Sequence, residues 1–188
     1  MAEMNRLLLW LINRRNVGRS RRLLGTVAPH LALGPTSRTL ELGAGIGGLS
    51  ALLYERYHLK EAVVTDYDAR QVETARAYLT RRFGTLPAAV RLEPADALAL
   101  KFGDASFEAV FAIGVLHHVE DRHADYVRRP TALAEIRRVL VPGGTFVYTE
   151  FTRTEDVRRT LSELGFTQVV PTQRMGHQDL EIYRAPAH

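Results

Sequence analysis

The residues from Thr39 to Gly48, TLELGAGIGG, have the types and spacing of a ligand-binding turn between a buried strand and a helix. Gly43, Gly45 and Gly47 alternate through it. Glycine lets the backbone adopt positive φ, and it lets a ligand approach because no Cβ stands in the way. A helix that begins at about residue 47 directs its free N–H groups toward such a ligand. We therefore expect this turn to be the centre of a binding site.

Three carboxylates are expected around this turn, because they lie at or just after the carboxyl ends of three successive predicted strands. Glu41 precedes the first glycine by two residues, Asp66 ends the second strand, and Asp96 follows the third. The carboxyl ends of parallel strands share one edge of a sheet. Carboxylates attract a cationic ligand and repel a pyrophosphate. Asp96 stands where it can accept a hydrogen bond from an exocyclic adenine amine, although aspartate is also common in surface turns.

A dinucleotide site is the competing interpretation of the same turn. Gly43, Gly45 and Gly48 satisfy the G-x-G-x-x-G pattern, with Asp66 as a ribose ligand. Glu41 is badly placed for phosphates, and no catalytic domain follows the nucleotide-binding pattern. Because these two features argue against it, a nicotinamide-dependent oxidoreductase is the alternative and not the main interpretation.

The elements that must position these side chains alternate between strand and helix, which predicts a doubly wound α/β fold with a parallel sheet. The expected helices are residues 47–57, 68–83, 131–140 and 155–164, with Asp68 as the N-cap of the second. The expected strands are 38–42, 61–65, 88–92, 107–113, 145–151, 166–172 and 180–185, with a turn at 141–144. Only the last connection, Pro171 to Asp179, is short and lacks a helix, so we expect an antiparallel final strand.

The bulk properties predict one domain of residues 34–188, preceded by an N-terminal helical segment of residues 1–33. The chain has 188 residues and no cysteine, which excludes disulfides and fits a cytoplasmic protein. The apolar run from Leu7 to Ile12 is too short to span a bilayer. The net charge of +4 is weak support for nucleic-acid binding. The arginine-rich N-terminal segment is interpreted as core-facing packing, with a lid or a membrane-surface helix as alternatives.

In order and spacing, the chain resembles class I S-adenosylmethionine-dependent methyltransferases over about residues 36–185. The segments that carry the resemblance are ELGAGIG at 41–47, VVTD at 63–66, ADA at 95–97, FEAV at 107–110, LHH at 116–118 and LVPGG at 140–144. The resemblance implies a seven-stranded sheet with an antiparallel last strand and helices on both faces. It also implies S-adenosylmethionine as the methyl donor.

The same resemblance implies roles for individual residues. Asp66 would bind the ribose hydroxyls, with Tyr67 beside the adenine. Asp96 and the backbone N–H of Ala97 would bind the adenine edge. Glu41 would hold the amino end of the donor. Backbone contacts to its methionine part would come from Gly43, Ala44, Gly45, Ala112 and Gly114.

Methyl transfer from a sulfonium is an in-line displacement, so proximity and orientation supply most of the acceleration. A general base is needed only for a protonated acceptor. His117 and His118 are the candidates, because histidine titrates near neutrality; the alternative is that either one packs or caps a helix. Trp10, Tyr148 and Glu150 are candidate substrate contacts, although helices can equally cover the last two. No metal ligands are expected.

We expect transfer to oxygen or nitrogen of a small molecule by a monomer or homodimer. The alternatives are an RNA or protein methyltransferase, a phospholipid N-methyltransferase with peripheral membrane contact, and a non-catalytic cofactor-binding subunit. The charged segment 120–129 is a candidate substrate loop. No substrate-binding insertion follows residue 151, so the acceptor stays open.

Overall fold

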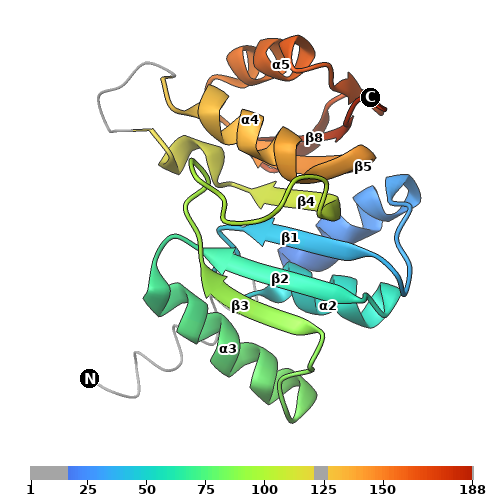
Figure 1. Cartoon of the computed structure of the whole chain (residues 1–188), viewed down its shortest axis with the longest axis vertical. Helices are drawn as coiled ribbons and strands as arrows, with labels where there is room; N and C mark the ends of the chain where they lie inside the picture. The colour runs from blue at the N-terminus through green and yellow to red at the C-terminus, as the bar shows by residue number, and fades with distance from the viewer. Residues whose placement is uncertain (1–16, 121–126, 188) are drawn as a thin grey trace.

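The computed structural model describes residues 17–120 and 127–187. Trp10 and most of the candidate substrate loop lie outside the described residues. Within them, the chain forms a central sheet covered by helices on both faces (Figure 1).

The sheet has the order β3-β2-β1-β4-β5-β8-β6, with β7 paired to β8. Its strands are β1 (Arg38–Leu42), β2 (Glu61–Asp66), β3 (Val90–Pro94), β4 (Phe107–Ile113), β5 (Leu140–Glu150), β6 (Thr167–Gln168), β7 (Gln173–Met175) and β8 (Gln178–Arg184). Strands β1 to β5 pair in parallel, and β8 is antiparallel to β5, β6 and β7. The doubly wound α/β prediction is confirmed, and the order reverses at β1, which lies between β2 and β4.

Two details of the strand prediction are corrected. The expected strand 166–172 is reduced to β6, and β7 forms after it, so the described residues hold eight strands where seven were expected. β7 turns into β8 through Gly176 at φ +67°. The expected turn at 141–144 lies inside β5 as an irregularity: Phe107 pairs with Leu140 and Ala109 with Thr145. Leu140 is buried at 1% exposure beside the fully buried Phe107, so the burial of this pair accounts for the early start of β5.

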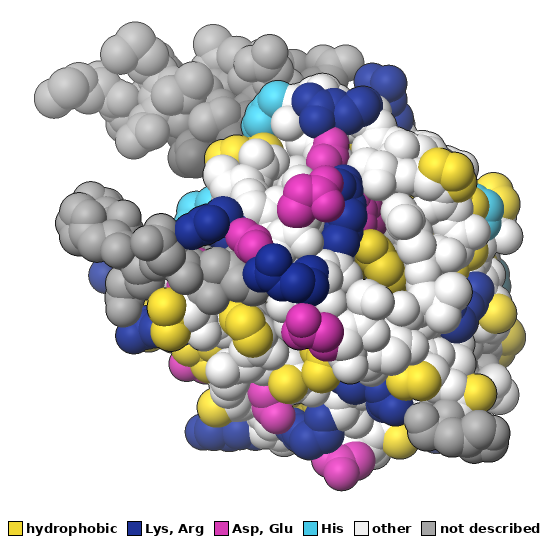
Figure 2. Space-filling view, turned by 90° about the horizontal axis from the view of Figure 1, so that it is seen from above, with side chains coloured by type: hydrophobic (Ala, Val, Ile, Leu, Met, Phe, Trp, Pro, Cys, Tyr) yellow, Lys and Arg dark blue, Asp and Glu magenta, His cyan; other side chains and the backbone are white. Residues whose placement is uncertain are grey.

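The helices pack against the sheet with their apolar faces. The helix at residues 17–27, α2 (Gly48–Tyr57) and α3 (Ala69–Phe83) cover one face of the sheet, while α4 (Arg129–Val139) and α5 (Thr154–Glu163) cover the other. Asp68 caps α3 as predicted, since its side chain accepts a hydrogen bond from the Arg70 N–H. The outer side of α5 carries i,i+3 acid–base pairs, and the face seen in Figure 2 mixes acidic and basic side chains.

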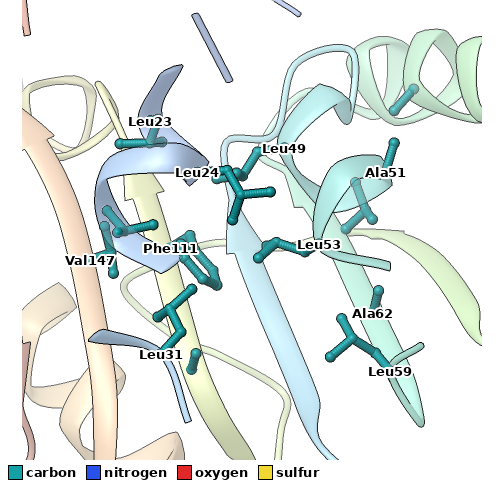
Figure 3. Close-up of a cluster of buried hydrophobic side chains, with 14 of the residues drawn as sticks. Leu23, Leu24, Leu31, Leu49, Ala51, Leu53, Leu59, Ala62, Phe111 and Val147 are labelled. Carbon is teal, nitrogen blue, oxygen red and sulfur yellow. The ribbon is translucent and has the colours of Figure 1, made fainter. Parts of the chain in front are cut away.

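Residues 17–31 contribute to the core of the sheet domain. Leu23 and Val27 are exposed by 1% and 0%, and they belong to the same apolar cluster as Phe111 of β4. Figure 3 shows Leu23 and Leu24 over the sheet, between Val147 and Leu49. The described part of the N-terminal segment is therefore a layer of this domain. None of the helices within residues 17–120 and 127–187 has the length and apolar character needed to cross a bilayer.

Candidate functional site

A cavity of about 610 Å³ opens at the carboxyl ends of the strands, where the strand order reverses. It brings together a large part of the site predicted from sequence. The predicted residues that line it are Gly43, Gly45, Asp66, Tyr67, Asp96, Ala97, Gly114 and His118. A smaller cavity of about 190 Å³ shares the glycine turn and adds Glu41 and Ala44. Two connected features, the turn and the strand ends, therefore define the site.

The glycine turn is shaped by backbone conformation and close packing. Gly43, Gly45 and Gly47 have φ of 61°, 54° and 73°, a region that side chains disfavour. A Cβ on Gly43 would lie 2.5 Å from Cγ2 of Val115, whereas a Cβ on Gly45 would meet nothing within 4 Å. Gly43 thus permits the packing of the turn against the loop after β4, and Gly45 leaves bare backbone facing the cavities.

Asp66 anchors the turn from the neighbouring strand. Its Oδ2 accepts a hydrogen bond from the Gly45 N–H at 3.1 Å, and its Oδ1 accepts from the Asp68 N–H at 3.1 Å. Each carboxylate oxygen has capacity for a further donor. Asp66 is therefore held at the wall of the cavity, with acceptor capacity left for hydroxyl groups of a ligand.

Asp96 and Tyr67 form the outer wall of the cavity. Asp96 is exposed, and its Oδ1 accepts a hydrogen bond from the Leu98 N–H at 2.9 Å. Asp96 thus stabilises a turn and also lines the cavity. The two interpretations of this residue from sequence, a turn residue and a ligand contact, are therefore compatible. Tyr67 is 78% exposed, an unusual state for a large ring. These side chains could flank a planar heterocycle.

Glu41 lies below the turn. It is 5% exposed, and its Oε2 accepts hydrogen bonds from the N–H and the hydroxyl of Ser50, in the first turn of α2. Burial raises the pKa of Glu41 from 4.5 to about 7, opposed by the hydrogen bonds from Ser50 and reinforced by the charge of Asp66. Glu41 therefore titrates near neutral pH at the floor of the smaller cavity.

Arg19 and Gln178 are site residues that the sequence analysis missed. Arg19, on the helix at residues 17–27, lines the smaller cavity together with Glu41 and donates a hydrogen bond to Oε1 of Gln178. The same oxygen accepts from the Thr149 hydroxyl at 2.9 Å, and Gln178 is 4% exposed. No sequence signal separates Arg19 from the other arginines of its segment, and a lone glutamine such as Gln178, at the start of β8, carries none.

The two candidate bases occupy different environments. His118 lines the main cavity and is exposed. His117 lies 3.1 and 3.2 Å, by its Nδ1, from the two carboxylate oxygens of Glu150, and its ring centroid is 4.0 Å from that of His118. Burial lowers the pKa of His117, and Glu150 opposes this shift.

Tyr148 and Glu150 do not line either cavity, which corrects their assignment as direct substrate contacts. Both are 0% exposed, because α5 and β8 cover this part of β5. The Tyr148 hydroxyl donates to Oε2 of Glu181 at 2.8 Å, and burial raises the pKa of Tyr148 far above its ordinary value. Glu150 accepts from the Phe151 N–H at 2.8 Å. Ala112 is also fully buried and lines neither of these cavities.

Glu120 was predicted only as part of the loop, yet it lines the main cavity. Its carboxylate accepts hydrogen bonds from the N–H groups of Val127, Arg128 and Arg129 at 3.0 to 3.2 Å, at the start of α4. Burial raises its pKa, but these N–H groups outweigh that effect and hold the pKa below the usual range. Glu120 therefore fixes the two ends of the 120–129 segment beside the cavity.

In the described part of the chain, no three histidine, aspartate or glutamate side chains gather as a set that could hold a metal ion. The lining of the two cavities combines carboxylates, His118, Tyr67, two arginines (Arg19 and Arg128) and bare backbone.

Comparison with known proteins gives a family match and more distant structural neighbours. Residues 40–148, more than half of the chain, match the family model described as a methyltransferase domain. The O-methyltransferase cnsE of Penicillium expansum is 36% identical over 127 residues, which cover 67% of this chain and 42% of that protein. A demethylmenaquinone methyltransferase of Deinococcus radiodurans is 36% identical over 115 residues, covering 61% of this chain and 43% of that protein. The matched region thus spans less than half the length of these relatives.

Among solved structures, the [4+2]-cyclase SpnF superposes with a TM-score of 0.73 at 18% identity, covering 89% of this chain and 82% of SpnF. At this identity the likeness concerns the fold alone. A protein named as a cyclase on the same fold shows that the chemistry must be argued from the site.

Proposed function

Since the chain belongs to the methyltransferase domain family, we propose that it is an enzyme that transfers a methyl group from S-adenosylmethionine to oxygen or nitrogen of a small-molecule acceptor. The observation that carries this proposal is the placement of Asp66 and Asp96 on the wall of one cavity beside the bare backbone of Gly43 and Gly45. Hydroxyl and amino groups of an adenosine are hydrogen-bond donors, which is what two carboxylates require.

The smaller cavity suits the amino-acid end of the same donor. Glu41 offers a carboxylate for an ammonium group, and Arg19 offers a guanidinium for a carboxylate. Charge-assisted hydrogen bonds of this kind are about twice as strong as neutral ones. Opposite charges in the lining of one cavity suit a zwitterion, which supports one ligand that extends across both cavities past Gly43 and Gly45.

The same geometry argues against a dinucleotide. Phosphates bind at the free N–H groups of a helix N-terminus. Here the Ser50 N–H of α2 is already bonded to Glu41 at 2.9 Å, and Asp66 holds the Gly45 N–H at 3.1 Å. A pyrophosphate would have to displace a carboxylate and would meet two negative charges.

When bound, S-adenosylmethionine supplies a methyl group activated by its sulfonium. The chain then has to orient the acceptor and, for a hydroxyl or ammonium acceptor, to take up one proton. His118 lines the main cavity and His117 packs beside it, both shortly after the end of β4, which supports them as candidates for that second task. The names of the relatives, an O-methyltransferase and a demethylmenaquinone methyltransferase, favour a small-molecule acceptor.

The donor is tested by calorimetric titration of the full chain with S-adenosylmethionine, with S-adenosylhomocysteine and with NADH. We expect saturable binding of the first two and no measurable heat with NADH. Tight binding of NADH without binding of S-adenosylmethionine would overturn the proposal.

A further inference from the structure

Glu150 and His117 form a hydrogen-bonded pair at the carboxyl ends of β4 and β5. The His117 Nδ1 faces both oxygens of Glu150, at 3.1 and 3.2 Å. The carboxylate is itself fixed, because Oε1 also accepts from the backbone N–H groups of Phe151 at 2.8 Å and Thr152 at 3.4 Å. Glu150 is fully buried, whereas 18% of the His117 side chain is exposed. The pair therefore has one interior end and one end that reaches outward.

The acceptor-only character of a carboxylate decides where the proton of a neutral His117 sits. An ionised carboxylate cannot donate, so the Nδ1 must carry the hydrogen. The lone pair then lies on Nε2, on the opposite side of the ring. Among the described residues, no hydrogen bond uses this Nε2, and it is not among the buried unpaired atoms, so it is accessible.

Neighbouring rings hold the orientation of His117. Its centroid is 4.0 Å from that of His118, which lines the main cavity, and 4.6 Å from that of Phe151. Phe151 in turn lies 5.6 Å from His177 of the hairpin between β7 and β8. The imidazole therefore packs against two rings, one of which, His118, lines the main cavity.

We propose that Glu150 is a positioning residue that holds His117 with its proton on Nδ1, so that Nε2 is the base that accepts the proton of the methyl acceptor. This inference rests on the proposed function. As the acceptor oxygen bonds to the methyl carbon and the carbon–sulfur bond breaks, the hydroxyl proton passes to Nε2. His117 becomes an imidazolium, Glu150 balances its charge, and the proton leaves to solvent afterwards. Glu150 thus acts through His117 and touches no substrate.

The charged groups around His117 set the expected direction of its titration. Burial lowers the pKa of His117, as do the charges of its chain neighbour His118 and of Arg129 in α4, whereas Glu150 of β5 raises it. Removal of the Glu150 charge should therefore lower the pKa of His117 further. The amide of a glutamine can also donate to Nδ1, which would move the proton to Nε2.

The test is nitrogen NMR of the histidine side chains in the ¹⁵N-labelled full chain, with the His117 signals assigned by comparison with His117→Gln. At pH 8, we expect a protonated Nδ1 and an unprotonated Nε2 in the unaltered protein; the variant serves only to assign the signals. A proton on Nε2 instead would overturn the inference.

Glu150→Gln, checked for folding by circular dichroism, should lower the pKa of His117 and populate the other tautomer. Glu163→Gln is the matched control, because Glu163 is exposed on α5 and should leave both unchanged. An unchanged His117 pKa and tautomer in Glu150→Gln would contradict a positioning role.

Addition of saturating S-adenosylhomocysteine separates this inference from the proposed function. We expect the His117 Nε2 signal to shift on binding. Calorimetric binding without any change at His117 would overturn the inference and leave the methyltransferase proposal in place. Absence of binding of both S-adenosylhomocysteine and S-adenosylmethionine would overturn the proposed function, and with it the role of His117 as its base.

Discussion

Glu41, on strand β1, accepts a hydrogen bond from the backbone N–H of Ser50 at 2.9 Å and so caps the first turn of α2 from outside the helix. The helix has no side-chain cap of its own, since its N-cap is Gly47 in the left-handed conformation. A free N–H at a helix start needs a partner, and a carboxylate there is favoured by the helix dipole. The Glu41 carboxylate thus connects β1 to α2 and also lines the smaller cavity, and it is buried in doing so.

The first prediction concerns the pH dependence that this burial creates. The folded-state pKa of Glu41, about 7, lies above the unfolded value of 4.5, so its contribution to stability is full below pH 4.5 and is lost as pH rises through 7. The shift corresponds to about 3 kcal/mol. Glu41→Gln should remove this loss, so its free energy of unfolding relative to the unaltered protein should rise between pH 5 and pH 8 in urea titrations. Glu73→Gln, on the surface of α3, is the control; a Glu41→Gln difference that is constant with pH would contradict the prediction.

The second prediction compares two carboxylates that are two positions apart in the chain, one expected to bind the methyl donor and one that caps a helix. Asp66 faces the cavity and Asp68 caps α3. Asp66→Ala should weaken binding of S-adenosylmethionine about 10- to 100-fold, which is the loss of a charge-assisted hydrogen bond of about 1.5–3 kcal/mol. Asp68→Ala should lower stability by about 1 kcal/mol and leave the affinity unchanged. Calorimetry and urea unfolding measure the two effects, and an unaltered affinity in Asp66→Ala would remove Asp66 from the donor site.

The third prediction tests whether Arg19 binds the carboxylate of the methyl donor. It compares the effect of one substitution on two ligands, one with and one without an amino-acid end. Arg19→Ala should weaken binding of S-adenosylhomocysteine by about tenfold or more, from the loss of a charge-assisted contact. It should leave methylthioadenosine, which has no amino-acid end, unaffected. Arg22→Ala, an exposed arginine on the same helix, is the control and should change neither. Equal weakening of both ligands by Arg19→Ala would instead indicate a general effect of the helix at residues 17–27.

The fourth prediction uses glycines that differ in space and conformation. Gly43→Ala combines positive φ with a Cβ 2.5 Å from Val115, whereas Gly45→Ala has positive φ and open space. We expect Gly45→Ala to lower the free energy of unfolding by about 1–2 kcal/mol through strain alone, and Gly43→Ala to lower it more, since overpacking adds about 1–3 kcal/mol. Gly25→Ala, exposed in the helix at residues 17–27, should instead be stabilising by up to about 1 kcal/mol. Equal losses at Gly43 and Gly45 would show that the Val115 contact relaxes freely.

Much of this protein is determined locally and could be predicted from sequence. The limits of β1 and β4 agree with the pattern, and α3 begins after Asp68 as expected, because apolar periodicity and a capping carboxylate act over a few residues. The carboxylates at the strand ends were likewise predictable. A parallel sheet brings successive strand ends to one edge whatever the details of packing, so Asp66 and Asp96 share a cavity.

Long-range packing decided the rest. Arg19 and Gln178 are 159 positions apart and meet only because the helix at residues 17–27 reaches the start of β8 in the folded chain. His117 and His118 are indistinguishable in sequence, yet one faces a buried carboxylate and the other a cavity. Tyr148 and Glu150 alternate correctly onto one face, but α5 and β8 bury that face. The sequence pattern determined which residues lie at the carboxyl edge of the sheet. Whether such a residue lines the cavity or is buried in the core depends on how segments that are distant in the chain pack over it.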